Sequence, residues 1–138
     1  MKAHRIAWSA LILCSISAVA ILAASSSWLA KVPDTDRQRV NPYAGNPQAI
    51  AAGRILFAEN CAKCHGSDAK GRYGRPSLRS QRVASATDGE LAWLLRNGSL
   101  AKGMPTWSSL PEPERWQIIA FLRSLPPDIS GFAISPPH

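Results

Sequence analysis

The stretch ENCAKCHGSDAKG, residues 59–71, holds two of the three cysteines and one of the three histidines of the 138-residue chain. Cys61 and Cys64 are three residues apart, and His65 follows the first cysteine by four residues. Residues at these spacings lie on one face of a helical turn. Two thiols and an imidazole are therefore expected to point in the same direction.

This pattern is the attachment signature of c-type haem, in which both sulfurs form thioethers with the haem vinyl groups and the histidine binds the iron. We therefore predict one covalent haem c per chain, held by Cys61, Cys64 and His65. A chain of this size builds only a modest core. The prosthetic group would supply apolar volume to that core as well as chemistry.

Three other interpretations of the two cysteines explain less of the pattern. A structural zinc site needs four ligands, and outside residues 61–65 the chain offers only Cys14, His4 and His138. A thioredoxin-like redox pair needs a preceding strand in a βαβ unit, and no segment alternates strictly as a strand would. A disulfide between the two cysteines is compatible with an oxidising compartment, but it gives His65 no role.

The ligand on the other side of the iron is assigned to Met104, which is the only methionine besides Met1. It lies in AKGMPTWSSL, a polar loop in which Gly103 and Pro105 interrupt regular structure. The alternative role is core filling, which is more typical of a methionine on an apolar helix face. A methionine paired with a histidine raises the haem potential and closes the iron to substrates.

The N-terminus, residues 1–30, is predicted to be a signal peptide or an N-terminal membrane anchor. Lys2 and Arg5 precede a mostly apolar run at residues 6–24, as in an export signal. The run is long enough to span a bilayer, and small residues at 23–27 offer a cleavage site. We expect an exported protein that is anchored at the periplasmic face of the inner membrane by this helix, or is released as a soluble periplasmic protein.

The remaining chain divides by composition into three parts. Residues 31–46, KVPDTDRQRVNPYAGN, mix charges with proline and glycine, show no helical period and are predicted to be a linker. Residues 47–125 are predicted to form the folded domain. Residues 126–138 carry four of the eleven prolines and are predicted to be a tail without regular structure.

Three helices are predicted in the folded domain, at residues 47–60, 88–98 and 112–125. The first has Asn46 as its N-cap and a proline in its first turn. The second follows Thr87, which forms a capping box with the glutamate three residues later, and it stops near a glycine. The third carries an apolar stripe and ends before two prolines. The fold class predicted from this pattern is all-α.

Residues 47–125 resemble the class I c-type cytochromes in their short, bacterial, monohaem form. AAGRILFAENCAKCHG is similar to the first helix and attachment site of that family, and ERWQIIAFLRSL is similar to its last helix. The resemblance implies a small fold of three main helices and loops around one haem. It also implies that Gly53 lets the last helix approach closely near Phe121.

Two further motifs carry the resemblance to the loops of the family. In YGRPSL, it implies that the carbonyl of Pro76 accepts the Nδ1 hydrogen of His65 and so leaves Nε2 for the iron. GMPTW is similar to the distal loop of the family, which implies that Met104 is the axial ligand and that Trp107 lies close to the haem propionates. The implied cofactor site is therefore Cys61, Cys64, His65, Pro76, Met104 and Trp107.

The predicted function is one-electron transfer by a monohaem c-type cytochrome in a respiratory or dehydrogenase-linked chain, and not the transformation of a small-molecule substrate. The expected partners are redox proteins, either a dehydrogenase, such as a quinoprotein dehydrogenase, or an oxidase or reductase. The alternative is a haem enzyme or gas-binding protein with an open distal site. No nucleic-acid partner is expected, because the chain is exported and lacks a basic strand interleaved with aromatic residues.

Basic residues are concentrated around the predicted site. Residues 60–86 hold six basic side chains and one acid, Asp68, within a chain of formal net charge +7. A positive surface around the haem would attract an acidic redox partner, whereas scattered charges simply face solvent. The residues concerned are Lys63, Lys70, Arg72, Arg75, Arg79, Arg82 and Lys102.

Overall fold

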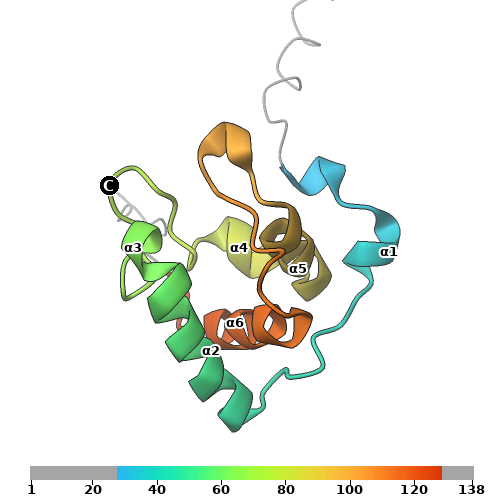
Figure 1. The fold of residues 1–138 in the computed structure, drawn as a ribbon, viewed down its shortest axis with the longest axis horizontal. Coiled ribbons are helices and arrows are strands. Elements are labelled where there is room, and N and C mark those ends of the chain that lie inside the picture. The colour runs from blue at the N-terminus through green and yellow to red at the C-terminus, as the bar shows by residue number, and fades with distance from the viewer. Residues whose placement is uncertain (1–27, 129–138) are drawn as a thin grey trace, which may run out of the picture.

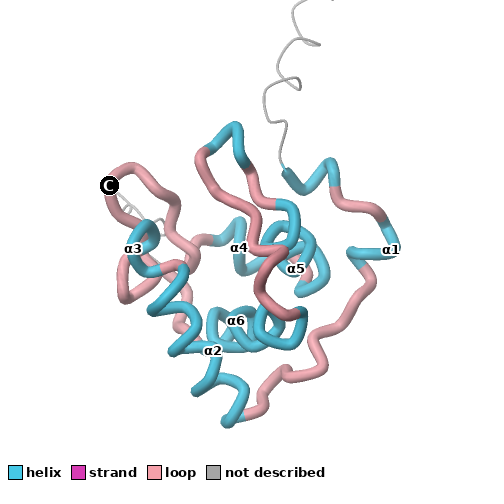
Figure 2. The backbone as a smooth tube through the Cα atoms, viewed as in Figure 1, coloured by secondary structure: helices cyan, strands magenta, loops and turns pink. Residues whose placement is uncertain are grey.

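The computed structural model describes residues 28–128, which fold into helices joined by loops (Figure 1). Figure 2 shows that loop makes up all of the chain between α3 and α4 and most of it between α5 and α6. The all-α prediction is confirmed for the described residues. The helices are η1 (Trp28–Lys31), α1 (Asp34–Arg37), α2 (Pro47–Asn60), α3 (Ala62–His65), α4 (Gln81–Ser85), α5 (Asp88–Asn97), η2 (Leu100–Lys102) and α6 (Glu112–Ser124).

Helices α2, α5 and α6 confirm the three helices predicted from the sequence, because their ends are encoded locally. The Asn46 side chain accepts a 2.9 Å hydrogen bond from the backbone N–H of Ala49 and so caps α2. At α5, Thr87 Oγ1 accepts from Glu90 N at 3.1 Å, and Glu90 Oε2 accepts from Thr87 N at 2.8 Å. These reciprocal bonds are the predicted capping box.

Helices α2 and α6 cross in close contact, and Gly53 makes that contact possible. A Cβ atom at Gly53 would lie 1.9 Å from the carbonyl oxygen of Gln117. One turn further along each helix, the rings of Phe57 and Phe121 pack with centroids 5.3 Å apart and an interplanar angle of 50°. The close approach expected near Phe121 is therefore centred one turn earlier, at Gln117.

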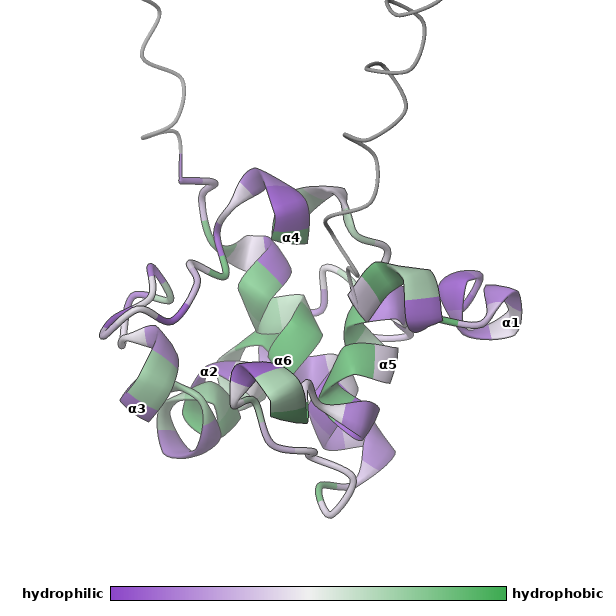
Figure 3. Cartoon of the chain, turned by 90° about the horizontal axis from the view of Figure 1, so that it is seen from above, coloured by the Kyte–Doolittle hydropathy of each residue, from purple (hydrophilic) through white to green (hydrophobic). Residues whose placement is uncertain are grey.

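The core consists of two clusters of buried side chains that meet along α6. One cluster is shared by α5 and α6 and includes Leu95, Trp116 and Ile119. The other lies between α2 and α6, where Phe57 and Phe121 are its largest members. Figure 3 shows the hydrophobic residues of α5 and α6 in the middle of the molecule, whereas α1 at its edge is largely hydrophilic.

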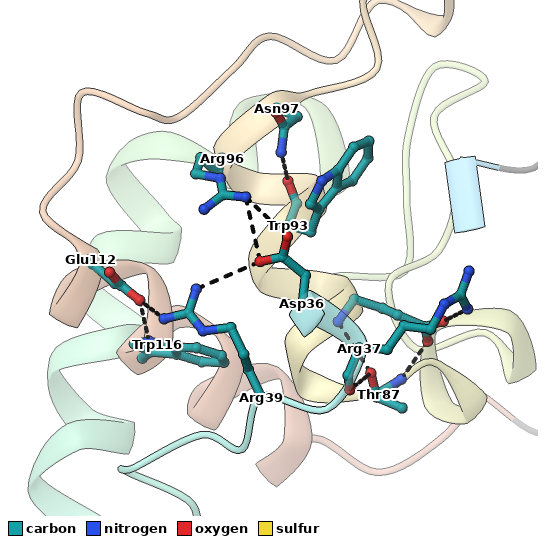
Figure 4. Close-up of polar contacts among 10 residues, drawn as sticks. Asp36, Arg37, Arg39, Thr87, Trp93, Arg96, Asn97, Glu112 and Trp116 are labelled. Carbon is teal, nitrogen blue, oxygen red and sulfur yellow. Dashed lines mark hydrogen bonds and ion pairs between the residues drawn. The ribbon is translucent and has the colours of Figure 1, made fainter. Parts of the chain in front are cut away.

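Residues 31–46 differ from the linker without regular structure that the sequence predicted, and we call them the N-terminal strap. Val32 and Asn41 are buried, with 4% and 3% of their surface exposed. Figure 4 shows the strap side chains held against α5 and α6. The ion pairs join Asp36 to Arg96, Arg37 to Glu90, and Arg39 to Glu112.

Hydrogen bonds and close backbone packing also fix the strap. Asn41 Nδ2 donates to the carbonyl oxygen of Trp116 at 2.9 Å, and its Oδ1 accepts from the backbone N–H of Tyr43 at 2.9 Å. Gly89 packs so closely that a Cβ there would lie 1.9 Å from the Asp36 carbonyl oxygen. The contacts are mostly polar, and the only α-helix of the strap has four residues. A search for apolar periodicity therefore does not detect it.

Within residues 28–128, no helix is long and apolar enough to cross a membrane. Residues 1–27, which hold nearly all of the predicted signal or anchor, lie outside the described residues, as do residues 129–138 of the predicted tail.

Replacing Gly53 with alanine should lower the free energy of unfolding by about 1–3 kcal/mol, because the methyl group collides with the α6 backbone. Helix propensity alone would change stability in the opposite direction, since alanine is favoured over glycine by roughly 0.5–1 kcal/mol. Urea denaturation of the holoprotein measures the difference. The control is Ala58→Gly on the exposed face of α2, which should cost only that propensity difference. A more stable Gly53→Ala variant would contradict the close crossing.

Replacing Asn41 with alanine should lower the free energy of unfolding by about 1–3 kcal/mol, because the hydrogen bonds of its buried amide to Trp116 and Tyr43 are lost. The matched control is Val40→Ala, since Val40 is 79% exposed and its truncation should change stability by less than about 0.5 kcal/mol. Thermal unfolding of Asn41→Ala and Val40→Ala measures the difference in stability between them. Equal midpoints would mean that the strap does not contribute to the folded domain.

Candidate functional site

The two cysteines and the histidine lie in one turn at the end of α2. The chain bends at Cys61, and the backbone N–H groups of Cys64 and His65 both donate to the Cys61 carbonyl oxygen, at 3.1 and 2.9 Å. Both thiols are free; Cys61 is buried and Cys64 is exposed. This turn extends from a helix that is packed against α6, so the core holds the three side chains in place.

Cys61 is part of the core cluster that contains Phe57 and Phe121. Burial, together with a smaller effect of the neighbouring Cys64, raises the pKa of the Cys61 thiol to about 11. A neutral thiol at this position packs as a small apolar group. The attachment turn is therefore fastened to the core by one of its own cysteines.

The imidazole of His65 is oriented by the loop that follows it. Nδ1 of His65 lies 3.0 Å from the carbonyl oxygen of Pro76. Because a carbonyl only accepts, Nδ1 carries the proton and Nε2 keeps its lone pair for a metal. The loop is held at Gly71, whose N–H donates to the His65 carbonyl at 2.7 Å. A Cβ at Gly71, where φ is 84°, would lie 2.3 Å from the Arg75 carbonyl oxygen.

Met104 and Trp107 lie on the loop between α5 and α6. The backbone of Met104 exchanges hydrogen bonds of 2.9 and 3.1 Å with Ser99, which closes residues 99–104 into a small loop. Gly103 completes the turn with a φ of 72°. The N–H of Trp107 donates to the Leu95 carbonyl at 2.8 Å, so the loop returns to α5.

The structure brings the predicted site residues together in two groups. Cys61 packs on the cluster between α2 and α6, whereas Met104 and Trp107 are half-buried against the cluster of α5 and α6. In Figure 1, the loop after α3 and the loop after α5 lie on the same side of α6. One hydrogen bond joins these loops: Arg75 Nη1 donates to the Lys102 carbonyl at 2.8 Å.

A cavity of about 410 Å³ lies beside the attachment turn. It is lined by the exposed Cys64 thiol and by three cations, Lys63, Arg72 and Arg75, together with Tyr73. His65, Met104 and Trp107 are not part of its lining, so this hollow lies beside the candidate cofactor site. The donor set suits haem c, because it combines two free thiols with an imidazole whose Nε2 is available.

A zinc site has no counterpart in the described residues. Across residues 28–128, no three histidine, cysteine, aspartate or glutamate side chains are grouped so that they could hold a metal ion.

Arg115 is a structural residue of the site that the sequence analysis did not single out. It is 9% exposed, and its Nη1 donates to the carbonyls of Trp107, Ser108 and Leu110. Burial lowers the pKa of Arg115 from its ordinary value, and Arg96 and Arg39 lower it further. The available signal was its position one turn before Ile119, on the apolar stripe of α6.

The basic residues singled out around the site differ in their ion pairing from the arginines of the strap, α5 and α6. Four arginines of the strap, α5 and α6 form ion pairs with acids: Arg37, Arg39, Arg96 and Arg123. In the described part of the chain, none of the seven cations singled out around the site forms an ion pair. The positive charge near the attachment turn is therefore not neutralised by ion pairs within residues 28–128.

Comparison with known proteins identifies relatives among cytochromes. Residues 48–122 match the family model described as cytochrome C oxidase, cbb3-type, subunit III. The cbb3-type cytochrome c oxidase subunit CcoP of Rubrivivax gelatinosus is 35% identical over 78 residues, which are 56% of this chain and 26% of that protein. Cytochrome c550 of Pseudomonas aeruginosa is 31% identical over 96 residues, 67% of this chain and 66% of that protein.

A third relative is an enzyme by name. The thiosulfate dehydrogenase of Stutzerimonas stutzeri is 28% identical over 120 residues, which cover 75% of this chain and 38% of that protein. The chain spans only about a quarter of the length of the first curated relatives it matches, 26% and 28%.

Solved structures give the same fold. Cytochrome CL of Methylophaga aminisulfidivorans superimposes with a TM-score of 0.56 and 31% identity, covering 63% of this chain and 59% of that chain. Cytochrome cL of Hyphomicrobium denitrificans gives a TM-score of 0.56 over 80% of this chain and 73% of that chain, and its 20% identity supports the fold alone.

Proposed function

Because this chain belongs to the c-type cytochrome family described as cytochrome C oxidase, cbb3-type, subunit III, we propose that it is a monohaem electron carrier. Family membership agrees with the resemblance seen in the sequence and implies covalently bound haem c. The observation that carries the proposal is the attachment turn. Its histidine has Nδ1 3.0 Å from a backbone carbonyl, which leaves Nε2 available for iron.

The proposed role of each site residue follows from its chemistry. Cys61 and Cys64 would hold haem c through thioethers, and His65 Nε2 would bind the iron while Pro76 fixes the imidazole. The bound haem c would supply one-electron chemistry through its ferric and ferrous states.

On the other side, the Met104 sulfur would complete the coordination, and Trp107 would lie close to the propionates. The loop that carries both residues is fixed at its base by Arg115. A soft sulfur ligand favours ferrous iron and leaves no open position for a substrate. The proposal is therefore a carrier that transforms no small molecule. The relative named as thiosulfate dehydrogenase keeps an enzyme with an open haem as the alternative to be tested.

We further propose that the partners are redox proteins, a dehydrogenase on one side and an oxidase or reductase on the other. Support comes from the relatives, which are named as an oxidase subunit and a dehydrogenase. Lys63, Arg72 and Arg75 lie beside the attachment turn and form no ion pair with a described residue, which favours an acidic docking surface on the partner.

The proposed location is the periplasmic side of the inner membrane, with residues 1–30 as anchor or cleaved signal. A retained anchor would make the protein fractionate with membranes and require detergent for release, with the haem domain open to protease only from the export side. The measurement is fractionation of cells that express the full chain, followed by N-terminal sequencing of the mature protein. A soluble mature protein that begins near residues 25–31 would show that the signal is cleaved.

Denatured protein should retain one haem by mass spectrometry, and acid-acetone should not extract it. Cys64→Ser should leave a single thioether or no stable holoprotein, because one of the two thioethers can no longer form. Haem that is extracted, or bound zinc without haem, would refute the attachment.

The haem-loaded protein also tests whether the chain is an electron carrier or an enzyme with an open haem. The oxidised protein should show the near-infrared sulfur-to-iron band, and its reduced form should bind carbon monoxide poorly. Met104→Ala should lose the band, bind carbon monoxide readily and have a lower potential. Thr106→Ala, an exposed change in the same loop, is the control and should leave all three unchanged. Rapid carbon monoxide binding and peroxide turnover by the unmutated protein, unaffected by Met104→Ala, would favour the open-haem enzyme.

A further inference from the structure

We propose that Arg75 is a positioning residue that holds the Met104 loop, residues 99–104, against the loop that orients His65. The inference rests on the proposed function, because it takes Met104 as the axial ligand. Its basis is a single side chain that reaches from the loop beside the histidine to the loop beside the methionine. The consequence would be a closed distal side, in which the methionine dissociates only when this contact breaks.

The far end of Arg75 lies on the tip of the Met104 loop. Its Nη1 donates to the Lys102 carbonyl oxygen at 2.8 Å. The guanidinium also occupies the space beside Gly103, where a Cβ atom would lie 2.6 Å from Nη1 and 3.1 Å from Nη2. Gly103 therefore provides both the left-handed turn, with a φ of 72°, and the room for the guanidinium.

The near end of Arg75 lies on a loop that is fixed relative to His65. The N–H of Arg75 donates to the Arg72 carbonyl at 2.9 Å, and the Gly71 backbone packs on the Arg75 carbonyl. The next residue is Pro76, whose carbonyl oxygen lies 3.0 Å from Nδ1 of His65. The side chain thus starts one residue before Pro76, which orients the histidine, and ends at Lys102 and Gly103, two residues and one residue before the methionine.

The Arg75 contact between the two loops has no substitute among the described residues. In the described range, 28–128, the Arg75 bond is the one hydrogen bond between residues 66–78 and residues 99–104, and no ion pair joins them. Two other bonds lie within the tip itself, where Lys102 N–H donates to the Ser99 carbonyl and Gly103 N–H donates to the Leu100 carbonyl, each at 2.8 Å. At the base, Ser99 pairs with Met104. Among the described residues outside the loop, only Arg75 bonds to its tip.

The chain offers a matched control in Arg72. It has the same charge and lies on the same loop, but its guanidinium bonds to the Tyr73 hydroxyl at 2.8 Å and stacks 4.5 Å from the Tyr73 ring. Comparing Arg75→Ala with Arg72→Ala therefore separates the loss of the bond to Lys102 from the loss of a positive charge. Arg75→Lys supplies the conservative variant, since lysine keeps a charged donor without the planar fork.

The experiment measures the rate at which imidazole binds to the oxidised, full-length holoprotein, followed by the shift of the Soret band. Imidazole is used because it is neutral at slightly alkaline pH, so a lost surface charge does not bias its approach. Arg75→Ala should bind imidazole about tenfold faster, the change expected when a hydrogen bond to a charged group is lost. Arg72→Ala should stay within about twofold of the unmutated protein, and Arg75→Lys should be intermediate.

Each outcome separates the inference from the proposed function. If the unmutated protein has the near-infrared sulfur-to-iron band and Arg75→Ala binds imidazole at the unmutated rate, Arg75 does not hold the loop. Equal acceleration by Arg72→Ala and Arg75→Ala would also overturn the inference, because the effect would then be one of charge. If the unmutated protein lacks the band and binds imidazole at once, the proposed methionine ligation itself fails.

Discussion

The contact between α2 and α6 at Gly53 is the constraint on which the rest of the structure depends. Because no side chain separates the two backbones there, Phe57 and Phe121 meet one turn later and form the centre of a core cluster. Cys61 joins that cluster one turn after Phe57. The attachment turn is consequently a continuation of the helix crossing, so a change in the crossing would displace the two thiols and the imidazole together.

The distribution of charge follows from a second long-range contact, that of the strap. Its acids and arginines pair with side chains of α5 and α6, and the ion pairs there are partly buried, as Arg37 with Glu90 is. Five acids of the strap, α5 and α6 are thereby paired with arginines. The cations beside the attachment turn, Lys63, Arg72 and Arg75, form no ion pair with a described residue. A field with this asymmetry orients an approaching acidic protein before contact.

Much of the fold could be predicted from the sequence because its signals are local. Asn46, Thr87 and the two prolines after α6 mark helix ends within a few residues, and the spacing of Cys61, Cys64 and His65 predicts the attachment turn. The strap could not be predicted in this way, because Asn41 bonds to a residue 75 positions later in the chain. The contacts of Arg115 and Arg75 could not be predicted for a related reason, although Arg75 was named among the basic residues around the site. Both bind backbone carbonyls, and a carbonyl has no signature in the amino-acid sequence.

Arg115 is buried and Arg75 is exposed, so the base and the tip of the Met104 loop should differ in the free energy that opening costs. Arg115 is 9% exposed and extends from α6, so breaking its bonds would remove a donor from the carbonyls of Trp107 and Leu110 at the loop base, where water has little access. Arg75 is exposed, and water can replace its bond to Lys102. Opening at the tip therefore costs less free energy than opening at the base. Motion of the loop should stay confined to residues 99–104, while Trp107 and the packing on α5 remain in place.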